Sequence, residues 1–169
     1  MKPFVVIMGV SGCGKTTVAS LLADRIPNAT FLEGDSFHPP ANKEKMGAGI
    51  PLTDEDRWPW YEVLNAAAHE AIASGSTPVL ACSTLKESYR KVLSRGFDAF
   101  RLVFLEGSFD LIKARMDERD HEYMTSTLLE SQFETLEEPE AGETVLTVSI
   151  GKSPEEIVEA VLSWLEETT

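Results

Sequence analysis

The octapeptide Gly9-Val10-Ser11-Gly12-Cys13-Gly14-Lys15-Thr16 sets the architecture of the chain around it. It matches the pattern G-x-x-x-x-G-K-[ST] at every fixed position. The apolar run Phe4–Met8 precedes it and a helical pattern starts at Lys15, so the octapeptide joins a buried strand to a helix. Glycines let successive backbone N–H groups turn inward around a phosphate, and the helix N-terminus adds its positive dipole end. The sequence therefore predicts a loop that binds the phosphates of a nucleoside triphosphate.

The loop residues have separate expected roles. Lys15 supplies a mobile positive charge to the outer phosphates and is expected to take part in catalysis, while the hydroxyl of Thr16 is a ligand for Mg²⁺. Ser83 follows the third predicted strand where a metal-binding aspartate is often found, so the metal is expected to rest on Thr16, the nucleotide and water. The residues predicted to contact the nucleotide are Gly9, Val10, Ser11, Gly12, Cys13, Gly14, Lys15, Thr16 and Thr17.

Outward from the loop, strand-like and helical patterns alternate through all 169 residues. This alternation predicts one α/β domain over residues 1–169, with a parallel sheet of about five strands between helices. The predicted strands are Phe4–Met8, Thr30–Leu32, Pro78–Cys82, Leu102–Leu105 and Val145–Ile150. The predicted helices are Lys15–Ile26, Pro59–Ala73, Glu87–Leu93, Phe109–Arg119 and Pro154–Leu165, the last with a capping box formed by Ser153 and Glu156.

The charge of the chain excludes several partners. It has 15 basic and 28 acidic residues, a net charge of −13, and residues 101–169 hold 17 of the acidic ones. Nucleic acids and anionic membrane surfaces attract basic faces, so neither is expected as a partner. No apolar run approaches the ~20 residues that span a bilayer, and the two cysteines form no disulfide framework, which favours a cytoplasmic location.

Several later segments act together with the loop to suggest a substrate. They are Glu33-Gly34-Asp35-Ser36-Phe37-His38-Pro39, Asn42, Lys45-Met46, Gly49–Trp60, Ala81–Lys86 with Tyr89-Arg90, and Ser131-Gln132-Phe133 with Leu136-Glu137. In this order the chain resembles the small P-loop gluconokinases from about Phe4 to near Glu143. It departs from the usual family pattern at Glu33, Cys13 and Thr84.

The resemblance implies a three-layer P-loop kinase fold with a helical lid at about residues 115–135. It also implies ATP and Mg²⁺ as cofactors, D-gluconate as the acceptor phosphorylated on its 6-hydroxyl, and a homodimer.

Residues near the carboxyl ends of the second and third strands are the candidates for the acceptor site. Asp35 is expected to orient the acceptor hydroxyl and to accept its proton, and Glu33 to hold a water bound to Mg²⁺. Because the acceptor is itself an anion, cations must meet its carboxylate. The residues predicted to bind the acceptor are Asp35, His38, Arg57, Lys86 and Arg90.

Arg115 and Arg119 lie four residues apart where a helix is expected to give way to the lid. Guanidinium groups at this place are expected to close over the β- and γ-phosphates, and Arg119 is also a candidate catalytic residue.

Two alternatives remain open from the residues alone. One is a kinase of the same fold for another small acceptor, such as shikimate or a nucleoside monophosphate. The other is a nucleotide-binding regulatory protein without transfer. A switch GTPase is disfavoured because Asn42-Lys43-Glu44-Lys45 lacks the aspartate of a guanine-reading motif.

Overall fold

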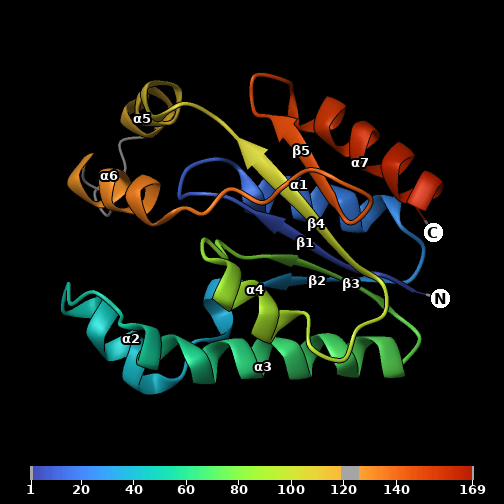
Figure 1. The fold of residues 1–169 in the computed structure, drawn as a ribbon, viewed down its shortest axis with the longest axis horizontal. Helices are drawn as coiled ribbons and strands as arrows, with labels where there is room; N and C mark the ends of the chain where they lie inside the picture. The colour runs from blue at the N-terminus through green and yellow to red at the C-terminus, as the bar shows by residue number, and fades with distance from the viewer. Residues whose placement is uncertain (1, 119–125, 169) are drawn as a thin grey trace.

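The computed structural model describes residues 2–118 and 126–168. Within them, five parallel strands form one sheet in the order β2-β3-β1-β4-β5 (Figure 1). The strands are β1 (Phe4–Met8), β2 (Ala29–Glu33), β3 (Thr77–Ala81), β4 (Phe100–Glu106) and β5 (Val145–Ser149). The α/β class and the parallel sheet predicted from the alternating patterns are confirmed. The strand ends differ from the prediction by at most two residues, and those of β1 do not differ.

The described helices are more numerous than the sequence patterns predicted. They are α1 (Lys15–Arg25), the 3₁₀ turn η1 (Gly34–Phe37), α2 (Pro40–Gly47), α3 (Asp54–Ala73), α4 (Glu87–Leu93), α5 (Phe109–Glu118), α6 (Ser126–Thr135) and α7 (Pro154–Thr168). No pattern predicted η1 or α2, whereas α6 falls within the helical lid that the family resemblance implies at about residues 115–135. The predicted start of α3 at Pro59 was wrong, since Thr53 caps a helix that begins at Asp54 and carries Pro59 in its interior.

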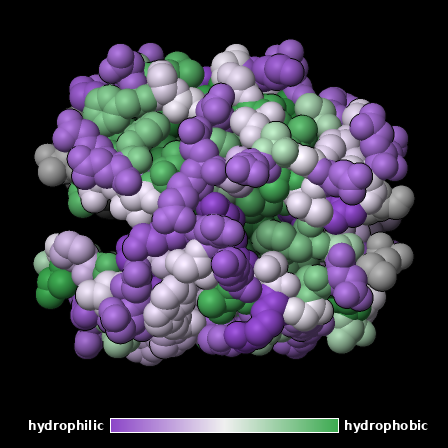
Figure 2. Space-filling view, viewed as in Figure 1, coloured by the Kyte–Doolittle hydropathy of each residue, from purple (hydrophilic) through white to green (hydrophobic). Residues whose placement is uncertain are grey.

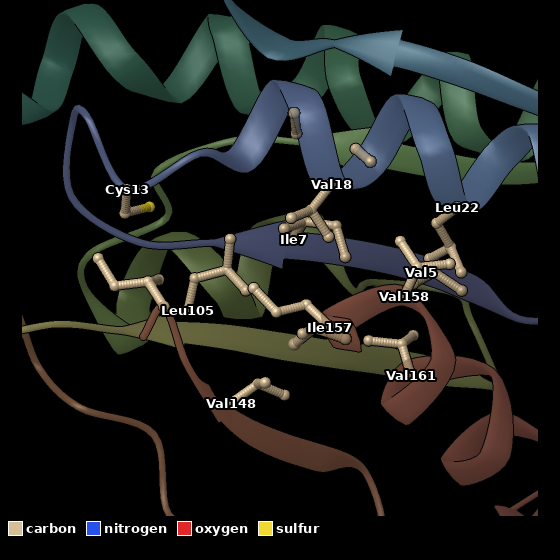
Figure 3. Packing of buried hydrophobic residues seen from close by; sticks show 14 of the residues in the cluster. Val5, Ile7, Cys13, Val18, Leu22, Leu105, Val148, Ile157, Val158 and Val161 are labelled. Carbon is tan, nitrogen blue, oxygen red and sulfur yellow. The ribbon is translucent and has the colours of Figure 1, made fainter. Parts of the chain in front are cut away.

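Helices cover both faces of the sheet and enclose two apolar clusters. All five residues of β1 are completely buried, which explains why this strand is apolar at every position. Val5 and Ile7 point to the cluster beneath α1 and α7 (Figure 3), whereas Phe4, Val6 and Met8 point to the cluster beneath α3 and α4. The predicted three layers are therefore present, with the central strand fixed from both sides.

The sheet order places the phosphate loop at a crevice. From β1 the chain passes to β2 on one side of the sheet, and from β3 it crosses to β4 on the other side. Such a reversal opens a crevice at the carboxyl ends of the strands, which is where ligands bind in open α/β sheets. At this end α2 lies on one side and α5 with α6 on the other (Figure 1), and the space-filling surface is hollowed between them (Figure 2).

The last helix has the start that its sequence predicts. The Ser153 N–H donates to Glu156 Oε1 at 3.0 Å, and the Glu156 N–H donates to Ser153 Oγ at 3.2 Å, so the capping box is formed. Among the described helices, none combines the length and apolar character needed to cross a membrane.

Candidate active site

The loop between β1 and α1 has the backbone that its glycines permit. Gly9, Gly12 and Gly14 all have positive φ, at 153°, 82° and 95°. A Cβ on Gly12 would also lie 2.8 Å from Met116 of α5, so the loop passes too close to that helix for a larger residue. Gly14 caps the N-terminus of α1, whose first turn carries no acidic residue. The helix dipole therefore faces the loop without a competing carboxylate.

Lys15 and Thr16 stand at the mouth of this loop. Lys15 Nζ donates to the Val10 carbonyl at 3.0 Å, which folds the ammonium group back over the loop. Thr16 Oγ1 donates to Glu33 Oε2 at 2.5 Å, joining the start of α1 to the end of β2. The structure therefore brings together Thr16 and Glu33, the two residues that the sequence proposed for the metal.

Two side-chain oxygen atoms at the loop, from Thr16 and Glu33, are possible ligands of Mg²⁺. The Thr16 hydroxyl and the Glu33 carboxylate are hard oxygen donors that already touch. Over the residues that the structure describes, no group of three or more His, Cys, Asp or Glu side chains could hold a metal ion by itself. Mg²⁺ commonly uses one or two protein oxygens and takes the rest of its ligands from phosphates and water. The pair fits that pattern.

Asp35 projects from η1, immediately after β2. Its side chain is 80% exposed. The turn that carries it is held by Gly34, whose carbonyl accepts the Trp60 indole N–H at 2.9 Å. Burial raises the pKa of the Cys82 thiol beside it to about 12, and the charges of both Lys15 and Asp35 act on that thiol. The predicted phosphate-binding lysine and the predicted base thus both act electrostatically on the residue that follows β3.

His38 is buried, whereas the neighbouring Asp35 is exposed. Its ring stacks on Trp60 with centroids 4.0 Å apart, and its Nε2 lies 4.0 Å from Asp35 Oδ1. The Asn42 amide nitrogen donates to the Asp56 carbonyl and lies 3.2 Å from His38 Nδ1. Desolvation by burial lowers the pKa of the His38 imidazole, with a smaller opposing effect from Asp35. The structure therefore packs His38 behind Asp35 in its neutral form.

Lys86 and Arg57 both approach one carboxylate, that of Asp54, which no sequence pattern singles out. Lys86 Nζ lies 3.2 Å from both oxygens of Asp54, and Arg57 Nη1 lies 3.9 Å from Oδ1. The Tyr89 hydroxyl donates to the same oxygen at 2.5 Å. The hydrogen bond from Tyr89, followed by that from Lys86, lowers the pKa of the Asp54 carboxyl. Asp54 and Tyr89 were detectable from sequence only as members of the quoted segments, because neither lies in a motif of its own.

Arg90 does not lie with these cations. It is 9% exposed, and its guanidinium donates to the carbonyls of Thr84 at 2.8 Å and Glu137 at 2.9 Å. Lys86 and Arg90 were expected to face one anion together, but Lys86 precedes α4 as its N-cap whereas Arg90 turns into the protein. This geometry gives Arg90 a structural role, and its contact with an acceptor stays a prediction.

The predicted lid is described only in part. Arg115 lies in α5, and its Nη2 donates to the Ile150 carbonyl at 2.6 Å. Arg119 lies outside the described residues, as do residues 120–125, so its expected phosphate contact stays a prediction. Residues 126–135 form α6, where Gln132 contacts Ser11 of the phosphate loop. Gln132 belongs to the segment Ser131-Gln132-Phe133 that carries the family resemblance, but its sequence context indicates no role for it.

Comparisons with known proteins agree with this arrangement. A family model described as an AAA domain matches residues 4–139. The chain is 45% identical to a gluconokinase from Gluconobacter oxydans over 96% of its length and 91% of that protein. It is 42% identical to the thermoresistant gluconokinase of Escherichia coli, covering 93% of the chain and 90% of that protein. A solved gluconokinase from Sinorhizobium meliloti superposes with a TM-score of 0.84 at 42% identity, covering 98% of the chain and 92% of that structure.

These three matches cover 93–98% of the chain. Together with the parallel sheet and the loop geometry, they show that the chain belongs to the gluconokinase family of P-loop kinases.

Proposed function

We propose that the protein transfers the γ-phosphoryl group of ATP to the 6-hydroxyl of D-gluconate, giving 6-phosphogluconate and ADP. The observation that carries this proposal is an intact phosphate loop in a chain that is 42–45% identical to named gluconokinases over nearly its whole length. Shikimate or a nucleoside monophosphate as acceptor, or nucleotide binding without transfer, has no comparable support among these relatives.

The loop side of the site supplies binding and charge. Backbone N–H groups of the loop other than that of Ser11, together with the N-terminus of α1, are proposed to hold the phosphates. Lys15 would leave the Val10 carbonyl to meet the outer phosphates. In the transfer, the bond between the acceptor oxygen and the γ-phosphorus forms as the bond to the bridging oxygen of ADP breaks. Negative charge on the phosphoryl oxygens is then neutralised by Lys15, with Arg115 and Arg119 proposed to contribute from the lid.

The acceptor side orients the hydroxyl and removes its proton. We assign the proton to the Asp35 carboxylate, which is exposed and lies in η1, directly after β2. His38 lies within 4.0 Å of Asp35 and supports its orientation toward the acceptor.

The charge of the cluster formed by Lys86, Arg57 and Asp54 suits a singly charged acid. Lys86 and Arg57 contribute two positive charges and Asp54 one negative charge, which leaves one excess positive charge. The gluconate carboxylate would balance it. Arg90 is proposed to act on the acceptor indirectly, by supporting the segment that bears Lys86.

Mg²⁺ is part of this proposal. Thr16 and Glu33 would hold it, Glu33 through a water, and the ion would neutralise charge that develops on the phosphates. We also propose a cytoplasmic homodimer acting in sugar-acid catabolism. The two cysteines are buried free thiols, which is compatible with a reducing compartment, and sedimentation would measure the oligomeric state.

Lys15→Ala and Asp35→Ala test the proposed roles in a coupled assay of ADP release. Lys15→Ala is expected to lower kcat/KM by at least about 10²-fold, and Asp35→Ala to lower kcat by about 10²- to 10⁴-fold with little change in the KM for ATP. Both should unfold at the wild-type urea midpoint, because Asp35 is exposed and Lys15 borders the loop mouth.

Lys2→Ala is the matched control, since it removes the same charge at the amino end of β1, away from the loop. A panel of gluconate, shikimate and nucleoside monophosphates separates the acceptors in the same assay. Full turnover by Lys15→Ala, or turnover with shikimate above that with gluconate, would overturn the proposal.

A further inference from the structure

Gln132 of α6 makes two hydrogen bonds to one residue of the phosphate loop. Its Oε1 accepts the Ser11 backbone N–H at 2.7 Å, and its Nε2 donates to Ser11 Oγ at 2.9 Å. The Ser11 N–H can only donate, so the orientation of the Gln132 amide is determined by this pair. A side chain 121 positions away in the sequence thus holds the backbone of the loop.

The chain that follows Gln132 is hydrogen-bonded to residues 85–90, the acceptor segment that carries Lys86. The Glu137 N–H donates to the Leu85 carbonyl at 2.8 Å, and Glu137 Oε1 accepts the Glu87 N–H at 3.0 Å. The Glu137 carbonyl accepts from Arg90 Nη2 at 2.9 Å. Three hydrogen bonds therefore join one residue to the stretch that positions Lys86.

Two further features make this connection stiff. Leu136, between the two anchor points, packs against the apolar clusters on both faces of the sheet. Thr84 has a φ of 41°, a strained conformation for a β-branched residue, and its buried hydroxyl has no partner among the described residues. Arg90 donates to the Thr84 carbonyl as well as to Glu137, so one guanidinium holds the strained residue and the end of the connection together.

We propose that residues 132–137 form a strap that couples the phosphate loop to the acceptor segment, with Gln132 and Arg90 as positioning residues at its two ends. The strap keeps the loop in its phosphate-binding shape and fixes its distance from the segment that carries Lys86. Such alignment matters because transfer requires the reacting atoms to be placed within a fraction of an ångström. The inference rests on the nucleotide-binding half of the proposed function.

Arg90 provides the distinguishing test, because its guanidinium bonds to the carbonyls of Thr84 and Glu137, far along the strap from the phosphate loop. The affinity for a non-hydrolysable ATP analogue, with Mg²⁺ and without acceptor, is measured by titration calorimetry. The variants are Gln132→Leu, Arg90→Lys and the double variant. Each single change is expected to weaken binding by about 3- to 30-fold. The double change is expected to weaken binding no more than the larger of the two single changes.

Matched controls separate the strap from general loss of stability. Glu134→Ala changes an exposed side chain on α6, and Val92→Ala removes apolar packing from α4 while leaving the Arg90 hydrogen bonds in place. Both are expected to bind the analogue as wild type does, whatever their urea midpoints. If Arg90→Lys does not fold, Glu137→Ala removes the acceptor of the Glu87 N–H and takes its place.

The outcomes are distinct. Unchanged affinity in folded Arg90→Lys or Glu137→Ala, or losses that multiply in the double variant, would overturn the strap and leave the proposed function intact. A wild-type protein that fails to bind the analogue would instead refute the proposed function. Weakened binding at both ends, without multiplication, supports the strap.

Discussion

Individual carboxylates in this protein hold neighbouring elements together. Asp54 gathers Lys86, Tyr89 and Arg57. Asp56, two residues later, closes the capping box of α3 and binds Lys45 of α2. The acidic start of α3 thus favours the helix dipole, pairs with Lys86 and Arg57, and joins α3 to α2.

Asp56 is expected to stabilise the fold only while it is ionised. The hydrogen bond from Lys45 Nζ at 2.7 Å and that from the Thr53 N–H at 2.9 Å lower the pKa of the Asp56 carboxyl from 3.8 to about 2. A group whose pKa is lowered by folding contributes stability above its ordinary pKa, and that stability is lost as the pH falls through the folded value.

Urea unfolding of wild type and Asp56→Asn measures this contribution. The difference in free energy of unfolding should be constant from about pH 7 to pH 5 and shrink from about pH 4 toward pH 2. Asp24→Asn, at an exposed position of α1, is the control. A difference that is the same at pH 7 and pH 3 would contradict the assignment.

At the scale of elements, η1 depends on how closely β2 and β3 approach. A Cβ at Gly34 would lie 2.6 Å from the Ala81 carbonyl and 3.2 Å from Cys82 Cβ. Gly34→Ala is therefore expected to destabilise the protein by about 1–3 kcal/mol and to displace Asp35, because neither neighbour can move without shifting β3. Thermal and urea unfolding with kcat in parallel would measure both effects.

Gly47→Ala is the matched control, since a Cβ at Gly47 meets nothing within 4 Å and the residue ends a helix. It should be neutral or stabilise by up to about 1 kcal/mol. Equal losses in the two variants would show that the contact at Ala81 is not the cause.

Elements were predictable where a local pattern was strong. Phe4–Met8 and Glu87–Leu93 were predicted with the bounds that the structure has. The start of α3 was not, because Pro59 resembles a first-turn proline while the actual start depends on the Thr53 and Asp56 side chains. The eight-residue α2 was missed because its polar, glycine-ending sequence has no apolar stripe.

At the scale of the molecule, the net charge of −13 works against the compact state. Like charges repel through the folded protein, and added salt screens that repulsion. The exposed ion pairs, such as Arg25 with Glu159, lose little when they are screened.

Raising NaCl from about 0.05 to 0.5 M should therefore raise the free energy of unfolding by about 1 kcal/mol, or the Tm by ~3 °C. The same salt should lower the affinity of the protein for the ATP analogue, because the loop and Lys15 are proposed to bind an anion. The Tm from scanning calorimetry and the affinity from titration calorimetry are measured in the same buffers. The Tm should rise with salt while the affinity falls. A Tm that falls steadily with salt would contradict the role given to the acidic excess.

The sequence by itself determined the strand, loop and helix around residues 9–16, the alternation of elements and the resemblance to gluconokinases. These features lie in local patterns, since a glycine permits a positive φ and a buried strand requires apolar residues wherever they occur. Tertiary structure alone decided that Arg90 turns inward, that Asp54 joins Lys86 and Arg57, and that Gln132 holds Ser11. Each of these depends on segments far apart in the chain being packed together, which no local pattern encodes.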